Sequence, residues 1–198
     1  MCRLIESIQI KDGELKNLRY HQERMNRSSR ALFGKLPEFS LHSLIIPEDA
    51  QLGIIKCRIV YNIVIEKVEF QSYEPRKINS LKLIFDDTVL YNFKYEDRRR
   101  LDEMLKQKGT SDDILLVKNG KITDTSYSNV VFRKGSSLYT PDTFLLNGTR
   151  RIQLLEEGII QEKKITVEEM QKMDSLILIN AMLDIKNGPE IKISSIFF

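Results

Sequence analysis

The chain has 198 residues, of which 41% are hydrophobic and 30% charged, and its 31 basic and 28 acidic side chains give a net charge of +3. This length suffices for one large domain or two small ones. The composition excludes a disordered or fibrous chain, and the small net charge gives no argument for nucleic-acid binding. Because no run of about eighteen apolar residues occurs and charges appear early, we expect neither a membrane span nor a signal peptide.

Two cysteines, Cys2 and Cys57, and two histidines, His21 and His42, lie far apart in the sequence. They match neither zinc-ligand spacing nor a disulfide framework, so no metal is expected, and a reducing cytoplasm is the expected compartment. The basic run at 98–100 has acidic residues on both sides, which is typical of a solvated helix face.

The first part of the chain predicts a sheet with one helix. Residues 3–10 alternate loosely and predict a strand, which the turn at 11–13 ends. Residues 54–70 are rich in β-branched side chains and predict two strands or one long bent strand. Residues 81–85 predict a further strand of this unit, and we expect the chain to cross to a second unit at 86–88.

A helix is predicted over residues 18–33, and Gly34 can end it in a left-handed conformation. One face of this helix, at spacings of three and four, is unusually polar for a core face: His21, Arg24, Met25, Ser28 and Leu32. An inward arginine needs an anion, since an unpaired buried charge is costly. Arg24 is therefore a candidate anion-binding residue.

The second part of the chain predicts helices and short strands in alternation. In chain order, the expected elements are a helix over 95–108 ended by Gly109, strands on both sides of the Asn119-Gly120 turn, strands at 129–133 and 138–140, a helix from 148 to about 157, a short helix capped by Thr166 with Glu169, and a buried strand at 176–180.

Several common enzyme classes have little support. Neither histidine stands beside a serine or cysteine in a local hydrolase pattern, and no glycine-rich nucleotide-binding sequence occurs. Lys94, between the two expected units, can serve as a Schiff-base nucleophile if its pKa is lowered. Asp124 follows a strand, and the helix start at 147–151 offers glycine and backbone N–H groups that suit a phosphate.

Taken in order, five short sequence elements resemble the class IV aminotransferases, the pyridoxal-phosphate enzymes that include branched-chain and D-amino-acid aminotransferases and 4-amino-4-deoxychorismate lyase. They are His21-x-x-Arg24, Lys94, Thr123-Asp124 followed by Ser128-Asn129 and Phe132, Thr140-Pro141, and Gly148-Thr149-Arg150-Arg151. The segment 179–182, Ile-Asn-Ala-Met, resembles the lyase branch. Each element is weak by itself, but all five in this order are specific.

The resemblance implies pyridoxal 5′-phosphate as the cofactor and assigns the site residues. Lys94 would hold the cofactor as a Schiff base and move a proton between the substrate α-carbon and C4′. Arg24 would pair with the phosphate, and Asp124 would keep the pyridine nitrogen protonated. The other implied cofactor-binding residues are Gly148, Thr149 and Arg150 at the helix start, with Ser128, Asn129, Asn180 and Ala181.

The chain departs from the family pattern in three ways. Asp124 stands where the family has glutamate, which shortens the reach by roughly an ångström, and a shift of the cofactor or a bridging water can make this up. Arg150 replaces a neutral residue, so it either adds charge at the phosphate or points to solvent. The family pattern also includes strands ahead of residue 3 that help to wall the substrate pocket, so the resemblance specifies the cofactor more closely than the substrate.

The resemblance implies a two-domain α/β (α+β) fold, with a small α+β domain over 1–88, a larger domain over 93–198 with a curved sheet or barrel, and a cofactor cleft between them. The leading function is lyase chemistry that releases pyruvate from an aminodeoxychorismate-like acid. An aminotransferase of branched-chain or D-amino acids uses the same residues, and a non-catalytic relative is a third reading. A homodimer that binds a small-molecule substrate, without nucleic acid or membrane, is expected.

Overall fold

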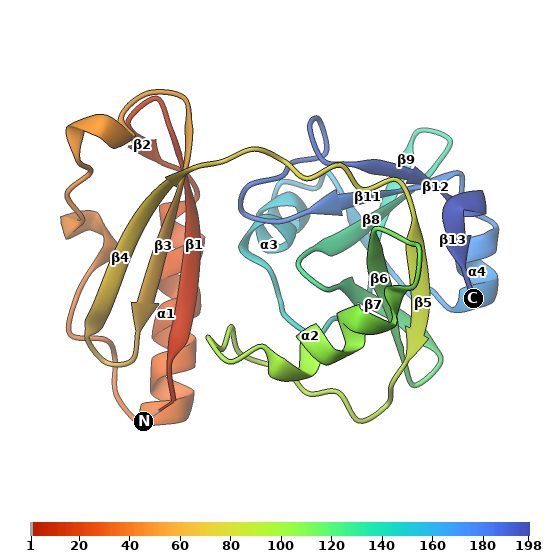
Figure 1. Cartoon of the computed structure of the whole chain (residues 1–198), viewed down its shortest axis with the longest axis horizontal. Helices are drawn as coiled ribbons and strands as arrows, with labels where there is room; N and C mark the ends of the chain where they lie inside the picture. The colour runs from red at the N-terminus through yellow and green to blue at the C-terminus, as the bar shows by residue number, and fades with distance from the viewer. Residues whose placement is uncertain (1) are drawn as a thin grey trace. The chain divides into compact units, whose positions relative to one another are not determined.

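The computed structural model describes residues 2–198 and divides the chain into two compact units. The first unit runs to Pro75 and also includes the later stretch Phe93–Asp97, whereas the second contains Arg76–Asn92 and Arg98–Phe198. Each unit has its own sheets and its own buried core (Figure 1). Lys94 therefore belongs to the first unit and Asp124 to the second.

A four-stranded antiparallel sheet, ordered β2-β1-β3-β4, and one long helix form the first unit. Its elements are β1 (Leu4–Lys11), β2 (Glu14–Leu15), α1 (Leu18–Phe33), β3 (Ile54–Tyr61) and β4 (Ile65–Ser72), with 3₁₀ turns at Leu41–Ser43 and Glu48–Ala50. Helix α1 lies along one face of this sheet (Figure 1). Leu4, Ile8 and Ile10 of β1 are fully buried and share a core with Met25 of α1.

The predicted helix over 18–33 is confirmed at both ends. Gly34 has a φ of 75° and donates its N–H to the carbonyl of Arg30, which is the expected left-handed end. The buried side chains of α1 are His21, Arg24, Met25, Ser28 and Ser29, so the polar face does point inward. The strand at 3–10 and the two-strand reading of 54–70 are also confirmed.

Two sheets and three helices form the second unit. The sheets are ordered β13-β5-β6-β7 and β10-β9-β8-β11-β12. The elements are β5 (Leu81–Phe85), α2 (Arg99–Leu105), β6 (Asp113–Lys118), β7 (Lys121–Thr125), β8 (Asn129–Lys134), β9 (Ser137–Pro141), α3 (Thr149–Glu156), β10 (Gln161–Lys163), α4 (Val167–Gln171), β11 (Ser175–Ile179), β12 (Glu190–Lys192) and β13 (Ile196–Phe197), with 3₁₀ turns at Lys106–Lys108 and Ile193–Ser195. Both strand orders are open, so residues 2–198 contain no closed barrel, and the barrel alternative is wrong.

The helix predicted over 95–108 begins four residues later than expected, at Arg99. The residues before it are held by hydrogen bonds to the start of the chain instead: Ile5 of β1 donates to the carbonyl of Lys94 at 2.9 Å, and Glu96 donates to the carbonyl of Arg3, just ahead of β1, at 3.0 Å. The strand β5 was expected in the first sheet, but it pairs with β6 and β13 instead. Both differences come from contacts between residues distant in sequence.

Local turn and cap signals in the second unit are confirmed. Asn119 and Gly120 join β6 to β7 with φ values of 50° and 71°, as a two-residue hairpin turn requires. Thr166 caps α4 by accepting a hydrogen bond from the N–H of Glu169 at 3.2 Å. Gly148 precedes α3, so this helix starts where the sequence predicted.

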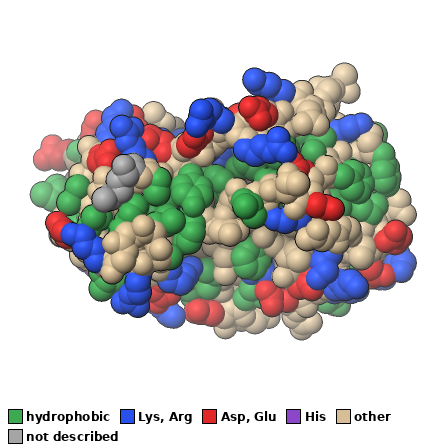
Figure 2. Space-filling model, turned by 90° about the horizontal axis from the view of Figure 1, so that it is seen from below, with side chains coloured by type: hydrophobic (Ala, Val, Ile, Leu, Met, Phe, Trp, Pro, Cys, Tyr) green, Lys and Arg blue, Asp and Glu red, His purple; other side chains and the backbone are tan. Residues whose placement is uncertain are grey.

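The surface carries mixed charges. On the face drawn in Figure 2, basic and acidic side chains are interspersed rather than gathered by sign. Within residues 2–198, no helix has both the length and the apolar character needed to cross a bilayer. The same residues hold no cluster of three or more histidine, cysteine or acidic side chains suited to a metal ion.

Candidate functional site

A buried charge cluster in the first unit joins β1 to α1. The carboxylate of Glu6 accepts hydrogen bonds from Arg24 Nε at 2.8 Å and Nη2 at 2.5 Å, a two-point ion pair. His21 Nδ1 lies 2.7 Å from Glu6 Oε2. Glu6 and His21 are fully buried and Arg24 is 6% exposed. The anion that the inward Arg24 needs is thus supplied within the chain by Glu6.

The protonation states in this cluster follow from burial and charge. Burial alone would raise the pKa of Glu6, but the charge of Arg24 and the hydrogen bonds from His21 and Arg24 outweigh it and hold this pKa at about 2. Burial lowers the pKa of His21, although Glu6 opposes the shift. Glu6 is therefore ionised and His21 neutral at pH 7. Since an ionised carboxylate only accepts hydrogen bonds, the proton of His21 lies on Nδ1.

Lys94 belongs to the same unit as this cluster. Its carbonyl accepts the N–H of Ile5, the neighbour of Glu6 on β1. The positive charge of Lys94 contributes to the lowered pKa of His21. Two of the predicted site residues, Arg24 and Lys94, thus belong to the charged part of the first unit around His21. Among the described residues of this unit, Glu6 carries the only buried carboxylate.

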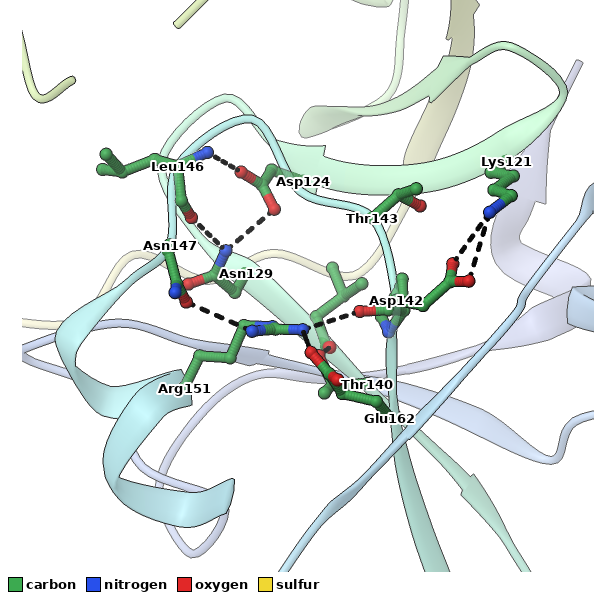
Figure 3. Close-up of polar contacts among 12 residues, drawn as sticks. Lys121, Asp124, Asn129, Thr140, Asp142, Thr143, Leu146, Asn147, Arg151 and Glu162 are labelled. Carbon is green, nitrogen blue, oxygen red and sulfur yellow. Dashed lines mark hydrogen bonds and ion pairs between the residues drawn. The ribbon is translucent and has the colours of Figure 1, made fainter. Parts of the chain in front are cut away.

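Asp124 organises a buried loop in the second unit. Its Oδ2 accepts the backbone N–H groups of Leu145 at 3.0 Å and Leu146 at 2.9 Å, and its Oδ1 accepts Asn129 Nδ2 at 2.8 Å (Figure 3). Asp124 is 6% exposed, and burial raises its pKa to about 6 against the opposing hydrogen bonds. A carboxylate has about four acceptor positions, so Oδ1 keeps one for a further donor.

Asn129 connects Asp124 to the start of α3. Besides its bond to Asp124, its Nδ2 donates to the carbonyl of Leu146 at 2.9 Å. Its Oδ1 fills the space beside Gly148, where an added Cβ would lie only 2.0 Å from it. Glycine at 148 therefore lets the amide of Asn129 pack against the backbone at the helix start. These contacts bring together Asp124, Asn129 and Gly148, as the sequence predicted for one site.

Two arginines follow this helix start, where the positive end of the helix dipole disfavours cations. Arg151 is buried and bonded to Asn147 Oδ1, the carbonyl of Pro141 and Glu162 Oε1, the last at 2.5 Å (Figure 3). Arg150 Nη1 donates to Gln153 Oε1 at 2.8 Å, and its Nε is buried without a hydrogen-bond partner. Neither arginine points freely to solvent, because their side chains are 2% and 11% exposed.

The strand end of β11 approaches the same region. Asn180 Nδ2 donates to Ser128 Oγ at 3.0 Å, and Asn180 Oδ1 accepts the N–H of Met182 at 2.8 Å. Ala181 lies between these two residues and is half-buried. Thr149 is buried in the first turn of α3. The predicted site residues of the second unit thus form two groups, one around Asp124 and one around Asn180. The neighbours Ser128 and Asn129 connect the two groups, because Ser128 bonds to Asn180 and Asn129 bonds to Asp124.

Two residues of these clusters, Glu6 and Arg151, were not among those predicted from the sequence. Glu6 was not named, although the alternation of β1 places it in register with the buried Leu4, Ile8 and Ile10. The sequence did contain a signal for Glu6: it places a carboxylate at an inward position of a strand, and Arg24 at an inward position of the helix. Arg151 was quoted in the helix-start element but not chosen, and its position three residues before the buried Leu154 indicated that it faces inward.

The contact between Gly148 and Asn129 gives a testable prediction. The φ of Gly148 is −71°, which alanine can adopt, so a Gly148→Ala variant meets only the Asn129 side chain. We expect a loss of about 1–3 kcal/mol in the free energy of unfolding from overpacking. In an Asn129→Ala background the contact is gone, and Gly148→Ala should then cost little. Denaturant titrations of the four proteins measure this coupling, and equal costs in both backgrounds would contradict it.

Comparisons with known proteins identify the family of this chain. The family model described as amino-transferase class IV matches residues 88–187. An uncharacterized protein of Haemophilus influenzae is 40% identical over 185 residues, covering 92% of this chain and 98% of that protein. The crystal structure of a protein from Haemophilus somnus, provisionally named 4-amino-4-deoxychorismate lyase, is 36% identical with a TM-score of 0.84, covering 92% of this chain and 97% of that one.

A more distant structure shares the fold. A hypothetical aminotransferase from Mycobacterium tuberculosis, solved in a form bound to pyridoxal phosphate, is 17% identical with a TM-score of 0.74, and the match covers 96% of this chain and 80% of that one. At this identity the likeness concerns the fold alone. The family match over half of the chain and the 40% identical relative are sufficient for a family assignment. This chain belongs to the class IV amino-transferase family.

Proposed function

We propose that this chain is a pyridoxal-phosphate-dependent enzyme that acts on an amino acid or an amino-substituted acid. The observation that carries the proposal is the start of α3. There a glycine packed against Asn129 precedes two arginines, and one of them, Arg150, keeps a buried Nε without a hydrogen-bond partner. Cations at a positive helix end are disfavoured unless an anion joins them. Glu162 already pairs with Arg151, and Asp184 lies 3.7 Å from Arg150, so a phosphate here would take the donor that remains, Arg150 Nε, together with the backbone N–H groups.

The residues present fit the phosphate of the cofactor. In this proposal the backbone at Gly148, Thr149 and Arg150 supplies N–H donors, because the first N–H groups of a helix have no acceptor within it. Because α3 has no acidic residue in its first turn, no carboxylate of its own occupies this role. In this proposal Arg24 also donates to the phosphate while it stays paired with Glu6.

Asp124 fits the ring nitrogen of the same cofactor. Its three internal hydrogen bonds use three of about four acceptor positions. The remaining position on Oδ1 can accept one N–H. The side chain of Asp124, one methylene shorter than the glutamate of the family, accepts the N–H groups of both Leu145 and Leu146.

Bound at these residues, pyridoxal phosphate supplies an electron sink that makes the proton on the substrate α-carbon removable. In this proposal Lys94 Nζ would hold the cofactor and, when displaced from it by the substrate amino group, would accept and return that proton. Glu6 holds Arg24 through a two-point ion pair and also contacts His21.

Between the reactions, we favour the lyase, which releases pyruvate from an aminodeoxychorismate-like acid. The Asn180-Ala181-Met182 segment and the likeness to the Haemophilus somnus protein support it. An aminotransferase of branched-chain or D-amino acids is the second candidate, since other structures with this fold are named aminotransferases. A homodimer in the cytoplasm, with the site near the dimer interface, remains a prediction from the family.

Product analysis tests the proposed function. Purified protein reconstituted with pyridoxal phosphate is incubated with aminodeoxychorismate, and separately with L- and D-amino acids plus keto acids. We expect pyruvate from aminodeoxychorismate, and loss of turnover in Lys94→Ala but not in Lys134→Ala, whose lysine is exposed on β8. Keto-acid formation from the amino acids would instead identify the aminotransferase. No product from any substrate, with the cofactor bound, would favour the non-catalytic relative.

A further inference from the structure

The side chain of Arg150 has a glutamine neighbour on its own helix. Arg150 Nη1 donates to Gln153 Oε1 at 2.8 Å, and Gln153 Nε2 donates to Glu157 Oε1 at 2.7 Å. Spacings of three and four place these residues on one side of α3. Turning the amide of Gln153 over would exchange its oxygen and its NH₂ group and break both bonds. The oxygen of Gln153 therefore stays directed at Arg150.

A carboxylate from a second segment also lies near this guanidinium group. Asp184 Oδ2 is 3.7 Å from Arg150 Nη1, and the side chain of Asp184 is 39% exposed. This distance is too long for a hydrogen bond. Asp184 therefore acts on Arg150 through its charge rather than by fixing a direction, and solvent weakens that attraction without removing it.

The carboxylate of Asp184 is held in place by its own turn. The N–H of Asp184 donates to Asn187 Oδ1 at 2.6 Å, and Asp184 Oδ1 accepts the N–H of Ile185 at 2.7 Å. Gly188 closes the turn by donating its N–H to the carbonyl of Asp184 at 2.6 Å. A Cβ at position 188 would lie 2.1 Å from the carbonyl oxygen of Leu178, so glycine lets this turn pack directly against β11.

The two neighbours of Arg150 have opposite effects on an anion that approaches it. Gln153 is uncharged and fixes one end of the guanidinium group, whereas Asp184 offsets its positive charge. Arg150 Nε is buried and has no hydrogen-bond partner, so it is the donor left for an anion. Both contacts depend on the arginine that this chain has where the family has a neutral residue.

We propose that Gln153 is a positioning residue for Arg150 and that Asp184 restrains the affinity of Arg150 for phosphate. The inference rests on the proposed function, which assigns the cofactor phosphate to the start of α3, and it adds how the affinity for that phosphate is set. Removing the charge of Asp184 then strengthens phosphate binding, whereas removing the oxygen of Gln153 weakens it. Opposite signs from two neighbours of one side chain distinguish this arrangement from general damage to α3.

Titrations of the purified full chain test the role of Asp184. Calorimetry measures binding of inorganic phosphate, and absorbance measures binding of pyridoxal phosphate. Asp184→Asn keeps the shape and can still accept the N–H of Ile185, and we expect it to bind both ligands about threefold more tightly. Asp174→Asn is the matched control, because Asp174 is an exposed carboxylate that also accepts a backbone N–H, that of Gly135 at 2.7 Å. It should leave both affinities unchanged.

The same titrations test Gln153 in two backgrounds. Gln153→Met keeps the length of the side chain but removes the acceptor, and we expect phosphate to bind about fivefold more weakly. Gln171→Met, at the exposed end of α4, should change nothing. Arg150→Gln weakens phosphate binding itself, and Gln153→Met should add no further loss in that background. A merely structural role of Gln153 would give the same loss in both backgrounds.

Two results would overturn the inference. One is an Asp184→Asn protein that binds phosphate no more tightly than Asp174→Asn, and the other is an equal loss from Gln153→Met with and without Arg150. The two proposals fail separately. Pyridoxal phosphate bound on Lys94, with an affinity that these variants do not change, would reject this inference alone. The expected changes for inorganic phosphate, in a protein that does not bind pyridoxal phosphate, would reject the proposed function and keep the roles of Gln153 and Asp184.

Discussion

Replacing Glu6 by alanine is expected to lower the free energy of unfolding by about 3–5 kcal/mol, because Arg24 would stay buried without its carboxylate. His21 would lose its partner as well. Glu14→Ala is the matched control, since Glu14 forms an exposed surface pair with Lys16 that should contribute less than about 1 kcal/mol. Denaturant unfolding at pH 7 measures both variants. A Glu6→Ala protein as stable as Glu14→Ala would contradict the role of the cluster.

The acid dependence of stability gives an independent test of the same ion pair. The pKa of Glu6 is held at about 2, below its ordinary value of 4.5. Its contribution is therefore complete above pH 4.5 and is lost as the pH falls towards 2. We expect Glu6→Gln to be less stable at pH 7 and to lose less stability than the parent over this interval. Parallel pH profiles would mean that Glu6 does not titrate as proposed.

The second large effect is expected at Asp124. Alanine at this position leaves the buried N–H groups of Leu145 and Leu146 without their acceptor, at a cost of about 1–3 kcal/mol for each group. Asparagine at 124 keeps the shape of the side chain but places an NH₂ group opposite the NH₂ group of Asn129. Asn129 cannot easily turn its NH₂ group away, because this group also donates to the carbonyl of Leu146. We therefore expect Asp124→Asn to be destabilised, but less than Asp124→Ala.

Asp124→Glu introduces the residue typical of the family. It keeps the carboxylate charge and changes only the length of the side chain. We expect a loss of about 1–3 kcal/mol, since the loop is fitted to the shorter side chain. Thermal unfolding reads out the stability, and proton exchange at the substrate α-carbon in deuterated water reads out the reaction step. Slow exchange in Asp124→Asn with the cofactor still bound supports contact with the ring. Equal exchange in the parent and Asp124→Asn would show that this carboxylate only holds the loop.

Local signals in the sequence predicted much of the fold. The helix over 18–33 followed from side-chain spacing and from Gly34, and the turn at 119–120 from its two residues, because both structures are decided within a few positions. The predicted start of the helix at residue 95 is wrong, because Lys94 and Glu96 hydrogen-bond to Ile5 and Arg3, some ninety residues earlier in the chain. Strand pairing over such distances leaves no local trace in the sequence.

The sequence predicted individual site residues, such as Arg24 and Asp124, better than it predicted their hydrogen-bond partners. An inward arginine at 24 required an anion, but the sequence could not say whether that anion was a ligand or a side chain, and the structure supplies Glu6. For Asp124, the sequence named the residue and its neighbour Asn129. The hydrogen bonds of Asp124 to Leu145 and Leu146 join residues more than twenty positions apart in the chain. The spacing of residue types in the sequence does not reveal such a contact.

The central claim is that Lys94 is the residue that binds pyridoxal phosphate. Borohydride reduction of the reconstituted protein, followed by peptide mapping, tests it most directly because the reduced cofactor stays attached to its lysine. We expect the label on Lys94, a yellow chromophore before reduction, and neither in Lys94→Ala. Label on a different lysine, or a parent protein that stays colourless with the cofactor present, would contradict the account.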